Sequence, residues 1–107
     1  MKNRKVLYIE DDANQRSEME EKLRSKGYLI RTSPSGEIGI KNAKSYHPDV
    51  ILCDFNLPDI NGLEVLYRLK KRNIEIPVII LTAHGSIPLA VKAIKEGAYD
   101  FIINRNK

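Results

Sequence analysis

Acidic side chains follow two apolar runs of this sequence, at the point where each run ends. Glu10, Asp11 and Asp12 come directly after residues 6–9, and Asp54 follows residues 50–53. Carboxylates that are held close together repel one another unless they are protonated or bridged by a cation. Hard oxygen ligands, few in number and open to water, suit Mg²⁺ or Mn²⁺ better than zinc. The pattern predicts a divalent-cation site that can hold phosphate oxygens.

A carboxylate at such a site can itself attack phosphorus and form an aspartyl phosphate. Asp54 is the candidate nucleophile, because a turn-forming role before Pro58 does not explain two converging carboxylates. For Asp12 a helix N-cap is favoured over a ligand role. Thr82 ends a third apolar run, and its hydroxyl could hydrogen-bond a phosphoryl group. The residue fits a buried, β-branched strand position equally well.

The elements that must position these side chains can be read from the apolar pattern. Four short apolar runs have the character of strands buried on both faces, as in a parallel sheet covered by helices: residues 6–9, 50–53, 78–81 and 101–103. Residues 28–32 are more polar and predict an edge strand. Segments of helical length and spacing lie between the strands: residues 14–26, 35–45, 63–72 and 87–96.

Strands that alternate with helices through short connections predict an α/β doubly wound parallel sheet with right-handed crossovers. Five strands fit the flavodoxin-like order 2-1-3-4-5, in which strand 1 lies beside strand 3. The switch point, where such folds bind ligands, then falls between Asp11 and Asp54. Thr82 and Asn104 end the next two strands at the same edge of the sheet. A length of 107 residues has room for this one domain, residues 1–107.

Composition excludes several other classes of protein. Apolar residues make up 42% and charged residues 30%, which is ordinary for a globular domain, and the net charge of +4 is spread along the chain, so we expect no direct nucleic-acid binding. The one cysteine, Cys53, excludes an internal disulfide, and we expect a buried, inert thiol. No apolar segment approaches the roughly 20 residues of a membrane span. A cytoplasmic protein is therefore expected.

Five fragments, in order along almost the whole chain, resemble the receiver domain of two-component response regulators. They are residues 6–12, 48–54, 57–62, 77–85 and 90–101. The last two fragments resemble receivers attached to enhancer-binding transcriptional activators. The resemblance implies a signalling domain and not an enzyme. It would take a phosphoryl group from a sensor histidine kinase or phosphotransfer protein and then alter a protein-interaction surface.

The same resemblance implies a role for each site residue. Asp54 would be the phospho-acceptor and Asp11 a direct Mg²⁺ ligand, with Glu10 completing the acidic pocket. The backbone carbonyl of Asn56 would be a further metal ligand. Two more residues would form the switch, the hydroxyl of Thr82 and the aromatic ring of Phe101.

Two features depart from the receiver pattern. Receivers carry a lysine, usually followed by proline, where this chain has Asn104 and Arg105. Asn104 offers a neutral amide in place of a full positive charge, a hydrogen bond weaker by roughly a factor of two. We therefore expect Asp54 to bind metal, but its coupling to Thr82 and Phe101 to be impaired.

The second departure is the length after the fifth strand, which leaves no room for a receiver's fifth helix. We expect uncovered apolar side chains beside that strand and the first helix, with lowered stability or self-association. Two explanations stay open: the chain is an excised or truncated fragment, or it takes the missing cover from a partner, such as an effector domain, or from a second copy of itself. These departures support an alternative function, a degenerate receiver that binds its partner independently of phosphorylation. A small phosphohydrolase is the third hypothesis, although Asn56 stands where such enzymes carry a second acid.

Overall fold

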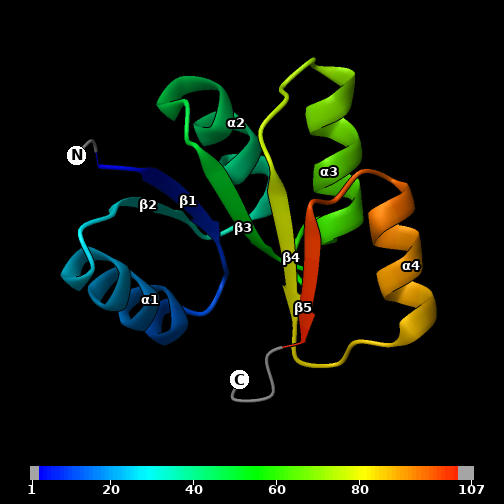
Figure 1. Ribbon diagram of the computed structural model, residues 1–107, viewed down its shortest axis with the longest axis horizontal. Helices are drawn as coiled ribbons and strands as arrows, with labels where there is room; N and C mark the ends of the chain where they lie inside the picture. The colour runs from blue at the N-terminus through cyan, green and yellow to red at the C-terminus, as the bar shows by residue number, and fades with distance from the viewer. Residues whose placement is uncertain (1–2, 104–107) are drawn as a thin grey trace.

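The computed structural model describes residues 3–103 as a single parallel sheet covered by helices (Figure 1). The five strands have the order β2-β1-β3-β4-β5, and every neighbouring pair is parallel. The elements alternate along the chain: β1 (Lys5–Ile9), α1 (Ala13–Ser25), β2 (Leu29–Ser33), α2 (Gly36–Tyr46), β3 (Val50–Asp54), α3 (Gly62–Lys71), β4 (Val78–Thr82), α4 (Ile87–Lys95) and β5 (Asp100–Ile103). The predicted flavodoxin-like fold and strand order are confirmed.

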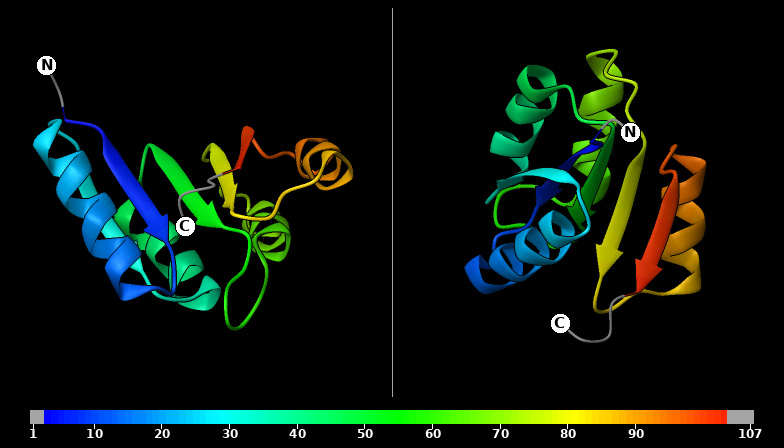
Figure 2. Two further views of the ribbon diagram at one scale, coloured as in Figure 1. Left: turned by 90° about the horizontal axis from the view of Figure 1, so that it is seen from below. Right: turned by 60° about the vertical axis from the view of Figure 1, so that its left-hand side comes forward.

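The two faces of the sheet are covered unequally (Figures 1 and 2). One face packs against α2, α3 and α4, and the main core lies there. This core takes Leu7 and Ile9 from β1, whereas the intervening Tyr8 faces the other layer. On that second face α1 contributes Met19 and Leu23 to a smaller cluster. Successive side chains of β1 therefore pack into two different cores, as expected for a strand buried on both faces.

The fifth strand differs from its prediction. We predicted a strand buried on both faces, but Ile102 is 44% exposed and Ile103 is 41% exposed. Phe101 alone of the strand's apolar residues packs against the main core. β5 lies at the edge of the sheet, and α4 contacts it. Among the described residues, the cluster on the α1 side of the sheet includes no residue of β5. The expected uncovered apolar side chains are thus present beside β5.

Four helices begin at a polar residue whose side chain accepts a hydrogen bond from a main-chain N–H of the first turn. Asp12 caps α1 in this way, which confirms the preferred interpretation of that residue. The same role falls to Ser35, Asn61 and Ser86 for the later helices. Each cap is the last residue of the loop that follows the carboxyl end of a strand. These polar residues therefore also determine where the loops at that edge of the sheet end and the helices begin.

One glycine allows α2 to approach the sheet closely. Gly39 is buried, and a Cβ atom built at this position would lie 2.7 Å from Cγ1 of Ile9. Any larger side chain would have to displace the Ile9 side chain or move α2 away from β1. None of the helices in residues 3–103 is long and apolar enough to cross a membrane.

Candidate functional site

Three carboxylates meet at the carboxyl ends of β1 and β3. One oxygen from each of Glu10, Asp11 and Asp54 lies within 4.8 Å of the others. Glu10 and Asp54 are buried, and Asp11 is exposed. The structure therefore brings together the acidic residues that the strand order predicted. Clustered carboxylate oxygens that are partly open to water are the donors preferred by Mg²⁺, so this donor set fits such an ion.

The buried Glu10 side chain is held by hydrogen bonds from two directions. The hydroxyl of Tyr8 donates to Oε1 at 3.3 Å, and the main-chain N–H of Asp12 donates to Oε2 at 3.1 Å. Burial, followed by the charge of Glu10, raises the pKa of Tyr8 well above its ordinary value. Tyr8 therefore remains a neutral donor beside the acidic cluster. The sequence analysis did not single out this tyrosine as a site residue.

The main chain of the acidic loop is held by a residue that the sequence analysis missed. Arg16, in the first turns of α1, donates from Nη1 to the carbonyl oxygens of Glu10 and Asp11, both at 2.9 Å. A basic residue one helical turn after an N-cap was the signal that could have identified it. Arg16 thus connects α1 to the loop that carries two of the three carboxylates.

The loop after Asp54 is anchored to a neighbouring helix. Asp59 accepts hydrogen bonds from the main-chain N–H groups of Gly36, at 2.9 Å, and Glu37, at 2.8 Å. Slight burial acts to raise the pKa of Asp59, but these hydrogen bonds outweigh it and hold that pKa below its usual value. The contact fixes the β3–α3 loop, in which Asn56 also lies, against the start of α2.

Thr82 and Phe101 end up on two adjacent strands, β4 and β5. Thr82 is fully buried, and its Oγ1 accepts a hydrogen bond from the main-chain N–H of His84 at 3.2 Å. Gly85 follows in the same loop, and a Cβ atom at that position would lie 3.0 Å from Cε1 of Phe101. The loop that begins at Thr82 therefore lies directly against the Phe101 ring.

The remaining predicted residues fall into two groups. Cys53 is fully buried in the main core, on the opposite side of β3 from the second core, and burial followed by the charge of Asp54 raises the pKa of its thiol well above the ordinary value. This agrees with the prediction of an inert thiol. Asn104 and Arg105 lie outside the described residues.

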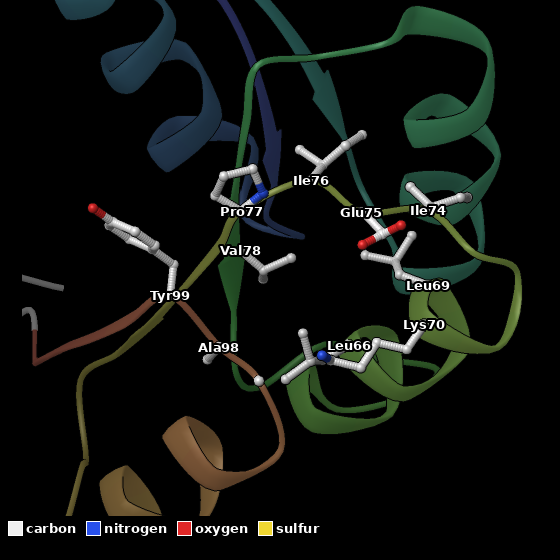
Figure 3. Close-up of a pocket in the computed structure, with 11 residues that line it drawn as sticks. Leu66, Leu69, Lys70, Ile74, Glu75, Ile76, Pro77, Val78, Ala98 and Tyr99 are labelled. Atoms are coloured by element: carbon white, nitrogen blue, oxygen red, sulfur yellow. The ribbon is translucent and has the colours of Figure 1, made fainter.

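A separate pocket of about 440 Å³ lies at the other end of the sheet (Figure 3). It is lined by apolar residues of α3 and of the segment leading into β4, with Lys70, Glu75 and Tyr99 adding polar groups. Val78 and Ala98, from the starts of β4 and β5, contribute to its wall. The pocket lies where β4 and β5 begin, and the acidic cluster lies at the opposite, carboxyl edge of the same parallel sheet, so the pocket is not part of that site.

The fold and the acidic cluster define a class, an α/β domain of flavodoxin-like topology with an oxygen-rich pocket at its switch point. Residues 6–106 match the response regulator receiver domain family. The chain belongs to this family. Receiver domains accept phosphoryl groups and are not catalytic enzymes, so membership removes the phosphohydrolase hypothesis.

Several relatives are transcriptional regulators. The chain is 39% identical over 98 residues to the cell cycle transcriptional regulator CtrA of Caulobacter vibrioides, a match that covers 92% of this chain and 42% of CtrA. It is 36% identical over 98 residues to the C4-dicarboxylate transport transcriptional regulatory protein DctD of Pseudomonas aeruginosa, covering 91% of this chain and 21% of DctD. This chain therefore spans less than half the length of either relative.

Solved receiver structures have the same fold. The signal receiver domain of a LuxO repressor protein from Vibrio parahaemolyticus superposes with a TM-score of 0.89 at 33% identity, covering 98% of this chain and 83% of that one. The structure named FixJ-N gives a TM-score of 0.87 at 33% identity, covering 97% and 83%. The relatives include receivers of enhancer-binding activators, as the sequence resemblance implied.

Proposed function

We propose that this receiver domain takes a phosphoryl group onto Asp54 in the presence of Mg²⁺. The donor is the phosphohistidine of a sensor histidine kinase or phosphotransfer protein in the cytoplasm. An oxygen of the Asp54 carboxylate forms a bond to phosphorus as the bond from phosphorus to the histidine nitrogen breaks, and the histidine ring leaves. The observation that carries the proposal is the meeting of Glu10, Asp11 and Asp54 within 4.8 Å in a member of the receiver family.

Four groups would hold the ion, the three carboxylates and the backbone carbonyl of Asn56. Mg²⁺ supplies charge neutralisation at the phosphoryl oxygens when it is bound. Burial of Glu10 and Asp54 keeps their carboxylates in a fixed place, and the exposure of Asp11 leaves a path for the donor. The contact made by Asp59 holds the loop in which Asn56 lies against the start of α2.

Phosphorylation then changes an interaction surface through Thr82 and Phe101. The known contact of Thr82 uses its oxygen as an acceptor, so the hydroxyl hydrogen can be donated to a phosphoryl oxygen. Movement of Thr82 toward the phosphoryl group would draw in the loop that carries Gly85. Because that loop packs against the Phe101 ring, its movement changes the space that the ring occupies. The exposed surface of α4 and β5 would report the change to an effector domain or another partner.

Asn104 favours a second candidate function, a receiver that binds its partner whatever the state of Asp54. A neutral amide gives a phosphoryl group a weaker hydrogen bond than the usual lysine. The phosphorylated state would then be poorly coupled to Thr82. In this alternative the surface is permanently in one form, and metal binding persists without switching.

The test is incubation with a small acyl phosphate donor and Mg²⁺, followed by intact mass measurement. We expect one added phosphoryl group on the wild type, none on Asp54→Asn, and none on either protein when Mg²⁺ is chelated. An Asn104→Lys variant shows whether switching is impaired, through the phosphate-dependent NMR shift of Thr82. Equal phosphorylation and equal shifts in the wild type and Asn104→Lys would remove the alternative. An unmodified Asp54 in both proteins would overturn the main proposal.

A further inference from the structure

Arg16 reaches back from α1 over the loop that connects it to β1. Its Nη1 atom donates to the carbonyl oxygens of Glu10 and Asp11, each at 2.9 Å. These carbonyls belong to the two peptide groups on either side of the Asp11 Cα atom. Holding both peptide groups restricts the two backbone dihedral angles of Asp11, and those angles determine the direction of its Cα–Cβ bond. One side chain thereby sets where the Asp11 carboxylate lies.

Asp11 needs such support more than the other two carboxylates do. Asp54 is the last residue of β3, and the main-chain N–H of Glu10 donates to the carbonyl of Ser33 at 2.9 Å, so both continue the sheet. Asp11 lies in the bend beyond β1 and is exposed. The hydrogen bonds of the sheet therefore do not fix the backbone of Asp11, and the hydrogen bonds from Arg16 hold it instead.

We infer that Arg16 is a positioning residue that fixes the carboxylate of Asp11 for a divalent cation. This inference rests on the proposed Mg²⁺ site. A guanidinium suits the role because it presents several N–H donors in a rigid, planar arrangement and remains charged. Groups that orient metal ligands without touching the metal commonly change metal affinity about 10-fold or more when they are removed.

A positioning role and a purely electrostatic role of Arg16 predict opposite changes in Mg²⁺ affinity when the residue is replaced. A positive charge next to a cation site repels the cation, so Arg16 acting through its charge alone would weaken Mg²⁺ binding. Its replacement by a neutral residue would then tighten binding. Arg16 acting through the two carbonyl contacts strengthens binding, and the same replacement weakens it. The sign of the change therefore separates the two explanations.

The experiment measures the Mg²⁺ dissociation constant by isothermal titration calorimetry for four proteins. Arg16→Gln removes the charge and the two-carbonyl contact, and we expect its dissociation constant to rise about 10-fold. Arg16→Lys keeps the charge on a differently shaped donor, and we expect a smaller rise in the same direction. Arg24→Gln is the matched control, because Arg24 lies on the same helix and pairs at 2.8 Å with Glu20. It loses the same charge and should bind Mg²⁺ as the wild type does.

A second measurement needs no metal. The Asp12 amide donates to Oε2 of Glu10 within the same loop, so its hydrogen exchange reports on local opening. We expect Arg16→Gln to speed exchange at Asp12 in the metal-free protein, and Arg24→Gln to leave it unchanged. Circular dichroism melting of each variant verifies that the fold is retained.

The outcomes distinguish this inference from the proposed function. If the wild type binds Mg²⁺ and both Arg16 variants bind it equally well or more tightly, the positioning role is wrong and the proposed site stands. If the wild type takes up no Mg²⁺, the proposed function fails and the metal-positioning role fails with it. Unchanged exchange at Asp12 in Arg16→Gln also counts against the inference.

Discussion

Asp59 accepts a hydrogen bond from the main-chain N–H of Glu37 at 2.8 Å, which connects the β3–α3 loop to the first turn of α2. Gly36 makes a second such contact to the same carboxylate. A negative charge at a helix N-terminus is favourable, because it satisfies N–H groups without helical partners and faces the positive end of the helix dipole. One carboxylate outside the helix therefore holds the loop that follows Asp54.

The first prediction concerns the replacement of this carboxylate. Asp59→Asn should lower the free energy of unfolding at pH 7 by about 1 kcal/mol, because the amide lacks the charge that faces the helix N-terminus and its one oxygen cannot replace both carboxylate oxygens as acceptors. The pKa of Asp59 in the folded protein lies below its ordinary value. The stabilisation is therefore fully present above the pKa of the unfolded chain, which is about 4. It is lost as the pH falls through the folded pKa. Urea unfolding of both proteins at pH 7 and at pH 3 measures the change.

Glu18→Gln provides a control for the loss of one negative charge, since Glu18 is exposed on α1. This variant should unfold like the wild type at pH 7. An Asp59→Asn protein as stable as the wild type at pH 7 would show that the loop contact contributes nothing.

The second prediction tests the buried pair beside the acidic cluster. Tyr8→Phe keeps the ring in the second core and removes only the hydroxyl that donates to Glu10. At 3.3 Å the hydrogen bond is long, so we expect a loss of about 1 kcal/mol in the free energy of unfolding. Thermal and urea unfolding measure it. Tyr99→Phe is the matched control, because Tyr99 is 73% exposed, and its stability should not change.

The sequence predicted the parts of the molecule that depend on local pattern. Buried runs and helical spacing were sufficient for the strand order, and acidic residues at the ends of two such runs were sufficient to place Asp11 near Asp54. These features follow from the chain itself, because parallel strands bring their carboxyl ends to one edge. The boundaries of the elements differ from the predictions by at most one residue at either end.

The contacts that support the site could not be predicted in the same way. The main-chain N–H groups that donate to Asp59 lie more than 20 residues away along the chain, so their meeting with its carboxylate depends on how α2 and the β3–α3 loop pack. The prediction that β5 is buried on both faces was wrong for a related reason. Residues 101–103 are apolar enough for a central strand, and their pattern alone does not reveal whether a helix covers each face. The expectation of uncovered side chains came instead from the comparison with a receiver's fifth helix. Both failures concern tertiary packing.

The third prediction tests the close approach of α2 to the sheet. Within a helix, Gly→Ala ordinarily stabilises a protein by up to about 1 kcal/mol. At Gly39 we expect the opposite sign, a loss of about 1–3 kcal/mol, because the added methyl group overlaps the side chain of Ile9. Urea unfolding measures the change. Ser45→Ala, at an exposed position of the same helix, should be close to neutral. A stabilised Gly39→Ala protein would mean that α2 shifts freely on the sheet.

The last prediction concerns the contact between Gly85 and Phe101. A methyl group at Gly85 would lie 2.7 Å from Cγ1 of Ile103 and 3.0 Å from Cε1 of Phe101, so these side chains or the loop must move. Gly85→Ala should therefore shift the ring proton signals of Phe101 in the unphosphorylated protein. The chain has two phenylalanines, and the signals of Phe55 serve as an internal reference.

Gly27→Ala is the control for a substitution at a distant glycine, because no atom lies within 4 Å of the added methyl group. It should leave the Phe101 signals unchanged. The variant should be less stable than the wild type, because alanine at position 27 would have to adopt the positive φ of Gly27. If the loop and the ring act together in switching, Gly85→Ala also reduces the further shift of Phe101 when Asp54 is phosphorylated. Phe101 signals that are the same in the wild type and Gly85→Ala, before and after phosphorylation, would show that the loop does not control the ring.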